Sequence, residues 1–117
     1  MQALLVGIGG FVGAIARFAV SKLTQLLYGG SFPIHTLFVN VVGCFLLGLF
    51  VSRSVQRGWP SSYSLFFAVG FIGALTTFSA FAAEASYLWQ GGKPFLASLF
   101  IFGNLVFGFL VFWASQR

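Results

Sequence analysis

The chain has 117 residues, enough for one domain, and only 6% of them are charged. Because a water-facing surface carries roughly a quarter of its residues as charges, a mean hydropathy of +1.00 excludes an ordinary soluble protein. The net charge is +5, but the cations are scattered between apolar runs, which favours lipid headgroup anchoring over a nucleic-acid-binding stripe.

Four apolar blocks follow one another along the chain, and each is close to the ~20 residues that a helix needs to cross the hydrocarbon. We predict spans at about residues 3–27, 36–52, 62–89 and 94–114, with Thr36 as the N-cap of the second. Turn-forming or charged residues separate the blocks. The expected fold is an all-α, multi-pass membrane protein with a single transmembrane domain, residues 1–117, in a bacterial plasma (inner) membrane.

The cations are divided almost equally between the two ends of these spans. Four crossings place both termini on one side, together with Arg53, Arg57 and Arg117, whereas Lys22 and Lys93 lie on the other, with Arg17 if its side chain reaches that way. The Lys and Arg asymmetry that normally sets orientation is therefore almost absent. Either the rule acts weakly in so small a protein, or the chain inserts both ways round and pairs antiparallel.

A few polar residues lie inside the predicted spans, where each is costly in hydrocarbon and needs a partner or water. Asn40 and Asn104 would most simply hold two helices together. Glu84, late in the third block, either reaches the interface or pairs with an arginine such as Arg17. Small residues recur four apart at Gly9 and Gly13, which predicts a low ridge for close helix packing.

The third block departs from a plain apolar helix. Two glycines and three hydroxyl side chains fall at mid-membrane depth in residues 70–81 (GFIGALTTFSAF), and a local break between Gly73 and Thr77 is expected. Unwound backbone at that depth is tolerated only where it is buried or lines a cavity, and there its carbonyls can hold a cation. The alternative is a kinked helix whose Thr hydroxyls bond back to their own carbonyls.

Beyond the expected break, Phe78 and Phe81 are three residues apart and share a helix face that Glu84 continues. Such a face is usually lipid contact or core. A phenyl edge, however, carries positive charge density and can meet a small anion. Combined with donors from Thr77, Ser79 and the Asn side chains, these edges would offer an anion contact without trapping it, as conduction requires.

At these residues the chain resembles the Fluc (CrcB) fluoride channel family over its whole length. Residues 13–17 (GAIAR) are similar to the family's G-A-x-x-R signature, and residues 36–43 (TLFVNVVG) to its T-L-x-x-N-x-x-G stretch. Residues 70–81, with Glu84 after them, resemble the G-F-x-G-G-x-T-T-F-S-T-F signature. The last match is long and unusual, and it carries most of the resemblance.

The resemblance implies a dual-topology homodimer with two antiparallel pores that pass fluoride passively down its gradient. It also implies a structural sodium ion at the dimer centre, bound by the backbone carbonyls of Gly73 and Thr76 from both copies. The implied pore residues are the phenyl edges of Phe78 and Phe81 and the polar side chains Asn40, Thr77, Ser79 and Asn104. Arg17 would lie toward a vestibule and attract anions.

Three positions depart from the family pattern: Ala80 replaces a usual Thr, His35 a common Gly, and Asn104 an expected Ser. Only the change at Asn104 affects a side chain that the resemblance implies as a hydrogen-bond donor to the anion, and an amide can still donate. We expect His35 to lie in a loop and therefore expect no gating by pH.

Two other classes remain open from the residues themselves. A small multidrug-resistance-type exporter also has four spans and dual topology, but it needs a carboxylate deep in a span, and the one acid here is Glu84. A non-transporting membrane subunit would need none of the ordered polar residues of the third block. No enzymatic function is expected, because one acid, one His and one Cys in different blocks form no catalytic set.

Overall fold

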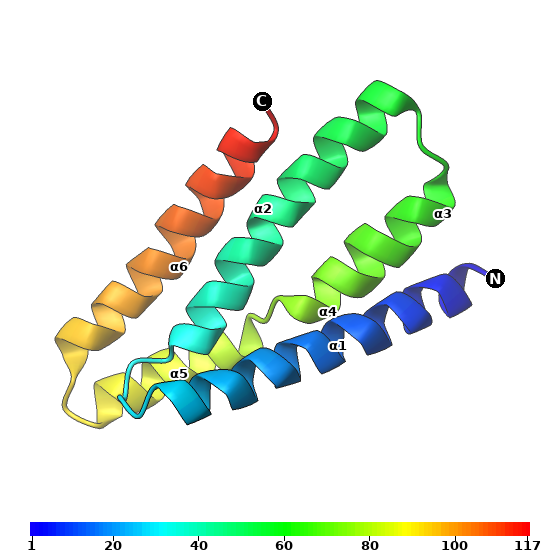
Figure 1. The fold of residues 1–117 in the computed structure, drawn as a ribbon. Helices are drawn as coiled ribbons and strands as arrows, with labels where there is room; N and C mark the ends of the chain where they lie inside the picture. The colour runs from blue at the N-terminus through cyan, green and yellow to red at the C-terminus, as the bar shows by residue number, and fades with distance from the viewer.

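The computed structural model describes all 117 residues, and the chain is entirely helical between its turns (Figure 1). The elements in order are α1 (Gln2–Leu27), α2 (Ile34–Arg57), α3 (Ser61–Tyr63), η1 (Ser64–Ile72), α4 (Gly73–Leu75), α5 (Ser79–Gln90) and α6 (Pro94–Ser115). The stretch from α3 to α5 forms the third long unit, Ser61–Gln90.

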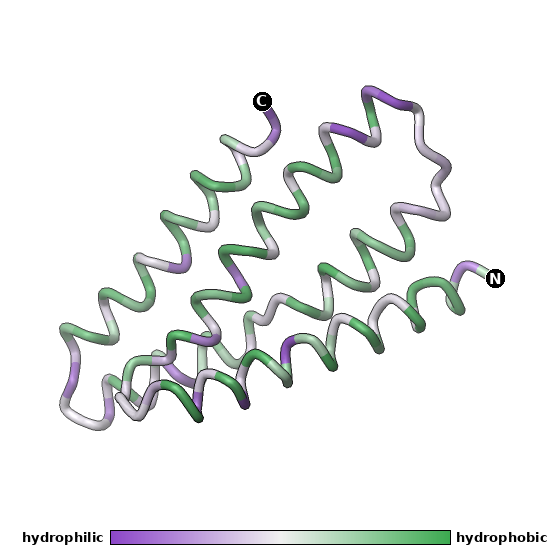
Figure 2. The backbone as a smooth tube through the Cα atoms, viewed as in Figure 1, coloured by the Kyte–Doolittle hydropathy of each residue, from purple (hydrophilic) through white to green (hydrophobic).

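Four helical units are long and apolar enough to cross a membrane, which confirms the predicted number of such helices. Apolar residues run along each of them, and hydrophilic ones gather mainly toward the ends and connections (Figure 2). The start of the second span was predicted wrongly: α2 begins at Ile34, and Thr36 is a buried residue inside the helix instead of its cap. The same helix runs on to Arg57, where Gly58 in a left-handed conformation ends it.

The helices pack as two neighbouring pairs joined by the lower half of the third unit. α1 lies along η1 and α4, whereas α2 lies along α6, and α5 also packs on α6 (Figure 1). The main hydrophobic cluster fills the α5–α6 contact and contains Phe81, Ala85, Leu88, Ala97 and Phe100. Only 18 of the 117 residues are buried, so lipid or another protein must cover most of the apolar surface.

The predicted glycine ridge makes the contact between α1 and η1. A Cβ added at Gly9 or Gly13 would collide with the backbone carbonyl of Phe66 or Phe71, respectively. Gly70 approaches from the other side, where an added Cβ would meet the Val6 carbonyl oxygen at 2.7 Å. Backbones this close exclude any side chain from the contact, so these glycines are steric requirements of the fold.

η1 is a π-helix of nine residues, which we did not predict. Its i→i+5 hydrogen bonds close wider turns than those of an α-helix. Residue types carry little signal for this choice, since the apolar, Phe-rich run of η1 is equally compatible with an α-helix.

The third unit is interrupted, as predicted, but over a shorter and later stretch. Gly73 keeps helical dihedrals (φ −60°, ψ −36°), and the backbone first becomes extended at Thr76 (φ −81°, ψ 158°). Helical structure resumes at Ser79, with Phe78 as the N-cap of α5. The break therefore occupies residues 76–78, midway along the third unit Ser61–Gln90, where backbone groups inside a membrane span need partners.

Candidate functional site

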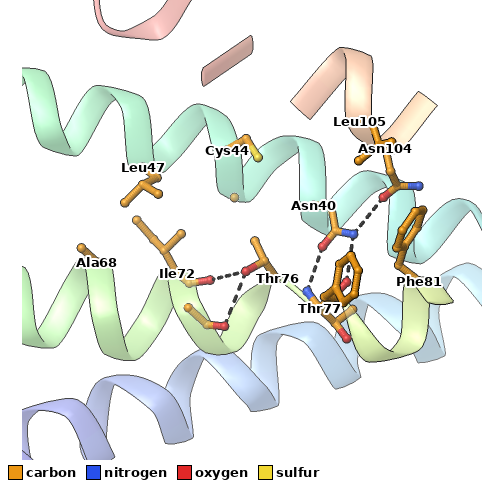
Figure 3. Close-up of a pocket in the computed structure, with 13 residues that line it drawn as sticks. Asn40, Cys44, Leu47, Ala68, Ile72, Thr76, Thr77, Phe81, Asn104 and Leu105 are labelled. Carbon is orange, nitrogen blue, oxygen red and sulfur yellow. Dashed lines mark hydrogen bonds between the residues drawn. The ribbon is translucent and has the colours of Figure 1, made fainter. Parts of the chain in front are cut away.

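The Asn40 side chain, from α2, binds the backbone of the break. Its Oδ1 accepts a hydrogen bond from the Thr77 N–H at 2.8 Å, and its Nδ2 donates to the Thr77 carbonyl at 3.1 Å (Figure 3). One amide thus pairs both backbone groups of a residue that has left the helix. Because unpaired backbone groups are expensive inside a membrane, this contact stabilises the break.

The same amide reaches the fourth span. Asn40 Nδ2 donates to Asn104 Oδ1 at 2.8 Å (Figure 3). Asn104 Nδ2 in turn donates to the Phe100 carbonyl at 2.8 Å. A primary amide has two N–H groups. Asn40 therefore has both of its donors in use, whereas Asn104 keeps one free beside the break.

The break also frees two carbonyl oxygens from helical hydrogen bonding. In a continuous helix the Thr77 N–H would donate to Gly73 and the Ala80 N–H to Thr76. Instead, Thr77 N–H donates to Asn40, and Ala80 N–H donates to the Thr77 hydroxyl at 3.2 Å. The two freed carbonyls belong to Gly73 and Thr76, the residues that the family resemblance implies as sodium ligands.

The kinked-helix alternative describes only part of this segment. Thr76 Oγ1 does bond back to the Ile72 carbonyl at 3.1 Å and lies 3.5 Å from that of Gly73. The Thr77 hydroxyl does not bond back to a carbonyl of the preceding turn. It accepts a hydrogen bond from the Ala80 N–H and so caps the first turn of α5. The backbone at Thr76 is extended, which a kink alone would not produce.

A cavity of about 300 Å³ opens beside the break, between α2, the third unit and α6. Seven of the predicted site residues line it, namely Asn40, Gly73, Thr76, Thr77, Phe78, Phe81 and Asn104. Apolar side chains, including Leu47, Ile72 and Leu105, complete the lining. The structure thus gathers most of the predicted site into one place from three separate spans.

The two predicted phenylalanines differ in environment. Their ring centroids are 5.5 Å apart with planes inclined by 47°. Phe81 is 8% exposed and packs against Phe100, whereas Phe78 is 76% exposed and stands out of the single chain. A ring that protrudes beside freed carbonyls at this depth needs a covering surface.

Ser79 and Arg17 do not reach that first cavity. They line a second cavity of about 400 Å³ with Thr77, Ser21 and His35, on the α1 side of the break. Thr77 borders both cavities. The predicted site is therefore divided into two adjoining cavities with the break as their common wall.

Glu84 pairs with His35 and not with an arginine. His35 Nε2 lies 3.0 Å from Glu84 Oε1. Our placement of His35 in a loop was wrong, because it is the second residue of α2. The two residues are 49 positions apart, so no local pattern could have paired them before the helices were assembled.

Comparison with known proteins identifies the family. Residues 4–116 match the family model described as "CrcB-like protein, Camphor Resistance (CrcB)". The chain is 43% identical over 114 residues to the "Fluoride-specific ion channel FluC" of Thermus thermophilus, which covers 97% of this chain and 91% of that protein. Proteins with the same name from Prosthecochloris aestuarii (42% over 114 residues, 97% of this chain and 88% of that protein) and Methanocaldococcus jannaschii (43% over 105 residues, 90% and 83%) are similar.

These matches cover nearly the whole chain at an identity that leaves no doubt about common ancestry, and they confirm the resemblance inferred from residues 70–81. They also confirm that the protein is a membrane protein and not an enzyme. The four spans, the break in the third and the full-length match together show that this chain belongs to the CrcB family, whose named relatives are the FluC channels.

Proposed function

We propose that this protein is a fluoride-selective channel that lets fluoride leave the cell passively down its gradient. The observation that carries the proposal is the first cavity, which is lined by Asn104, with one N–H left unpaired, and by the Phe78 and Phe81 rings. Neither a carboxylate nor a fixed cation lines that cavity. Phenyl edges and neutral donors attract an anion weakly enough to release it, which suits conduction.

Within this cavity we assign the first anion contact to Asn104, because it has the open donor. Asn40 contributes when fluoride takes the place of Asn104 Oδ1 as the acceptor of one of its two Nδ2–H groups. The bond to the Thr77 carbonyl holds the break and stays. Thr77 and Ser79 supply hydroxyls, and Arg17 in the adjoining cavity attracts anions toward the entrance.

The working unit in this proposal is a homodimer with two pores. A single chain leaves Phe78 exposed and the carbonyls of Gly73 and Thr76 without backbone donors at mid-membrane depth. A second copy on this face would cover the ring and bring four carbonyl oxygens together. Hard cations such as sodium prefer oxygen ligands of this kind, so the residues fit a structural sodium ion whose role is to neutralise those carbonyl dipoles.

We further propose that the two copies lie antiparallel. Arg53 and Arg57 lie in the last turns of α2 and Arg117 follows α6, whereas Lys22 lies near the end of α1 and Lys93 precedes α6. The first three cations are therefore at one end of the spans and the two lysines at the other. Arg17 lines a cavity with His35 at the start of α2, which makes the count three against three. A cysteine tag at one terminus should then label from both faces of a cell membrane, and one-sided labelling would refute this arrangement.

The channel proposal is tested by ion flux. Protein reconstituted in liposomes should dissipate a fluoride gradient rapidly and leave a chloride gradient intact. Absence of fluoride flux, or equal chloride flux, would overturn the proposal. A drug exporter is disfavoured because the one acid, Glu84, is hydrogen-bonded to His35 and lies outside the first cavity.

A further inference from the structure

His35 and Glu84 form a titratable pair next to the cavity that leads to the break. The two side chains are partly buried, with exposed fractions of 26% and 22%. The second carboxylate oxygen of Glu84, Oε2, is buried and has no hydrogen-bond partner. The carboxylate therefore depends on the imidazole as its one observed donor.

The pair lies along the proposed route of the anion. His35 lines the cavity of Arg17, Ser79 and Thr77, and it also lines the next cavity outward, which contains Glu84. On α5, Glu84 is three residues after Phe81, so both side chains lie on the same face of that helix. A change in the charge of this pair would therefore act on fluoride as it approaches the rings.

The charged and titratable groups around the pair come from three directions. α1 contributes Arg17 to the inner cavity, and Tyr28, just after its end, borders the outer one. Lys93, before α6, shares a further cavity with Glu84. Among these side-chain types, imidazole is the one that ordinarily changes charge near neutral pH, so we assign a response in that range to His35.

We propose that the His35–Glu84 pair is a proton-sensitive gate for anion entry, an inference that rests on the proposed fluoride channel. With a neutral imidazole, Nε2–H donates to the carboxylate and the pair carries one negative charge, which repels fluoride. Protonation of the imidazole makes the pair an ion pair of zero net charge and leaves the positive charge of Arg17 uncompensated. Acid therefore favours fluoride entry, and the channel passes fluoride faster as pH falls.

The expected size is estimated from Coulomb's law for a unit charge assumed to lie on the order of 10 Å from the anion. At effective dielectric constants between about 25 and 80, removal of that charge changes entry by about two- to tenfold. We therefore expect fluoride efflux from liposomes to be about two- to tenfold faster at pH 5.5 than at pH 7.5. The pH is kept equal on both faces, and the leak of protein-free liposomes is subtracted because hydrogen fluoride crosses lipid unaided.

Two substitutions separate the charge of the pair from its hydrogen bond. His35→Gln keeps a neutral donor but cannot titrate, so its efflux should be slow and equal at both pH values. Glu84→Gln removes the negative charge, so its efflux at pH 7.5 should be at least as fast as that of the wild type at pH 5.5. Arg57→Gln, at the opposite end of α2 from His35, is the matched charge control and should keep the wild-type ratio.

His35 is the one histidine of the chain, so ¹⁵N-histidine NMR reports its charge without mutation. The imidazole should be charged at pH 5.5 and neutral at pH 7.5. A wild-type efflux ratio near one, a wild-type ratio in His35→Gln, or an imidazole that does not change charge would overturn the gate while leaving the channel intact. Absence of fluoride efflux from the wild type at both pH values would overturn the channel itself.

Discussion

The third span is held by two contacts that work in opposite ways. Its upper half, η1, lies against α1 through Gly9, Gly13 and Gly70, where backbones meet with no side chain between them. Its lower half begins at a break whose backbone is bonded by the Asn40 amide of α2. The first contact is steric and apolar, and the second is polar and directional.

The difference shows which half can serve an ion. Close glycine packing leaves no space for an ion between η1 and α1, so that contact is structural. The lower half takes two N–H groups away from the carbonyls of Gly73 and Thr76 and places a partly unused amide, Asn104, beside them. Polar groups left over from secondary structure are the ones that a protein can offer to a ligand.

The largest effect is expected from Asn40→Ala, which removes the polar contact. It leaves the Thr77 N–H and carbonyl unpaired, at a cost of about 1–3 kcal/mol each, or about 2–6 kcal/mol in the free energy of unfolding. Denaturation in detergent should show this loss, and fluoride flux should disappear. Asn104→Ala, which leaves both Thr77 bonds in place, is the control and should cost less. An Asn40→Ala protein as stable as the wild type would contradict the role assigned to this amide.

Gly13→Ala tests the steric contact. The new Cβ would collide with the Phe71 carbonyl, and we expect a loss of about 1–3 kcal/mol in the free energy of unfolding. Gly7→Ala on the same helix is the matched control, because an added Cβ there meets nothing within 4 Å. That variant should be unchanged or slightly more stable, since Ala favours helix over Gly. Equal stability of the two variants would refute the close approach.

The smallest effect is expected from Phe78→Ile, which tests function without disturbing either contact. An aromatic interaction of about 0.5–1.5 kcal/mol corresponds to a two- to tenfold fall in fluoride flux. Stability of the single chain should hardly change, because Phe78 is 76% exposed there.

Phe11→Ile, at another exposed ring outside the cavity, is the control and should leave flux unaltered. Phe81→Ile should lower both flux and stability, since that ring is buried. Unchanged flux in Phe78→Ile would argue against coordination by ring edges.

Much of this architecture could be predicted from local patterns. Apolar length located the four spans, the four-residue glycine spacing located the α1 contact, and the Gly and Thr residues of the third block located its break. Each of these features depends on residues close together in the chain. The errors were local as well: the start of α2 and the exact extent of the break depend on hydrogen bonds that residue types only bias.

The amino-acid sequence by itself determined that the chain spans the membrane four times and that the third span is interrupted near Thr76. Only the tertiary structure decided what that interruption does. Asn40 meets Thr77 across 37 positions, and His35 meets Glu84 across 49. Helical periodicity relates residues three or four apart and is silent on such pairs. They form because the packing of four helices brings their side chains together. The same packing surrounds the break in the third unit with side chains from other helices and so forms the site.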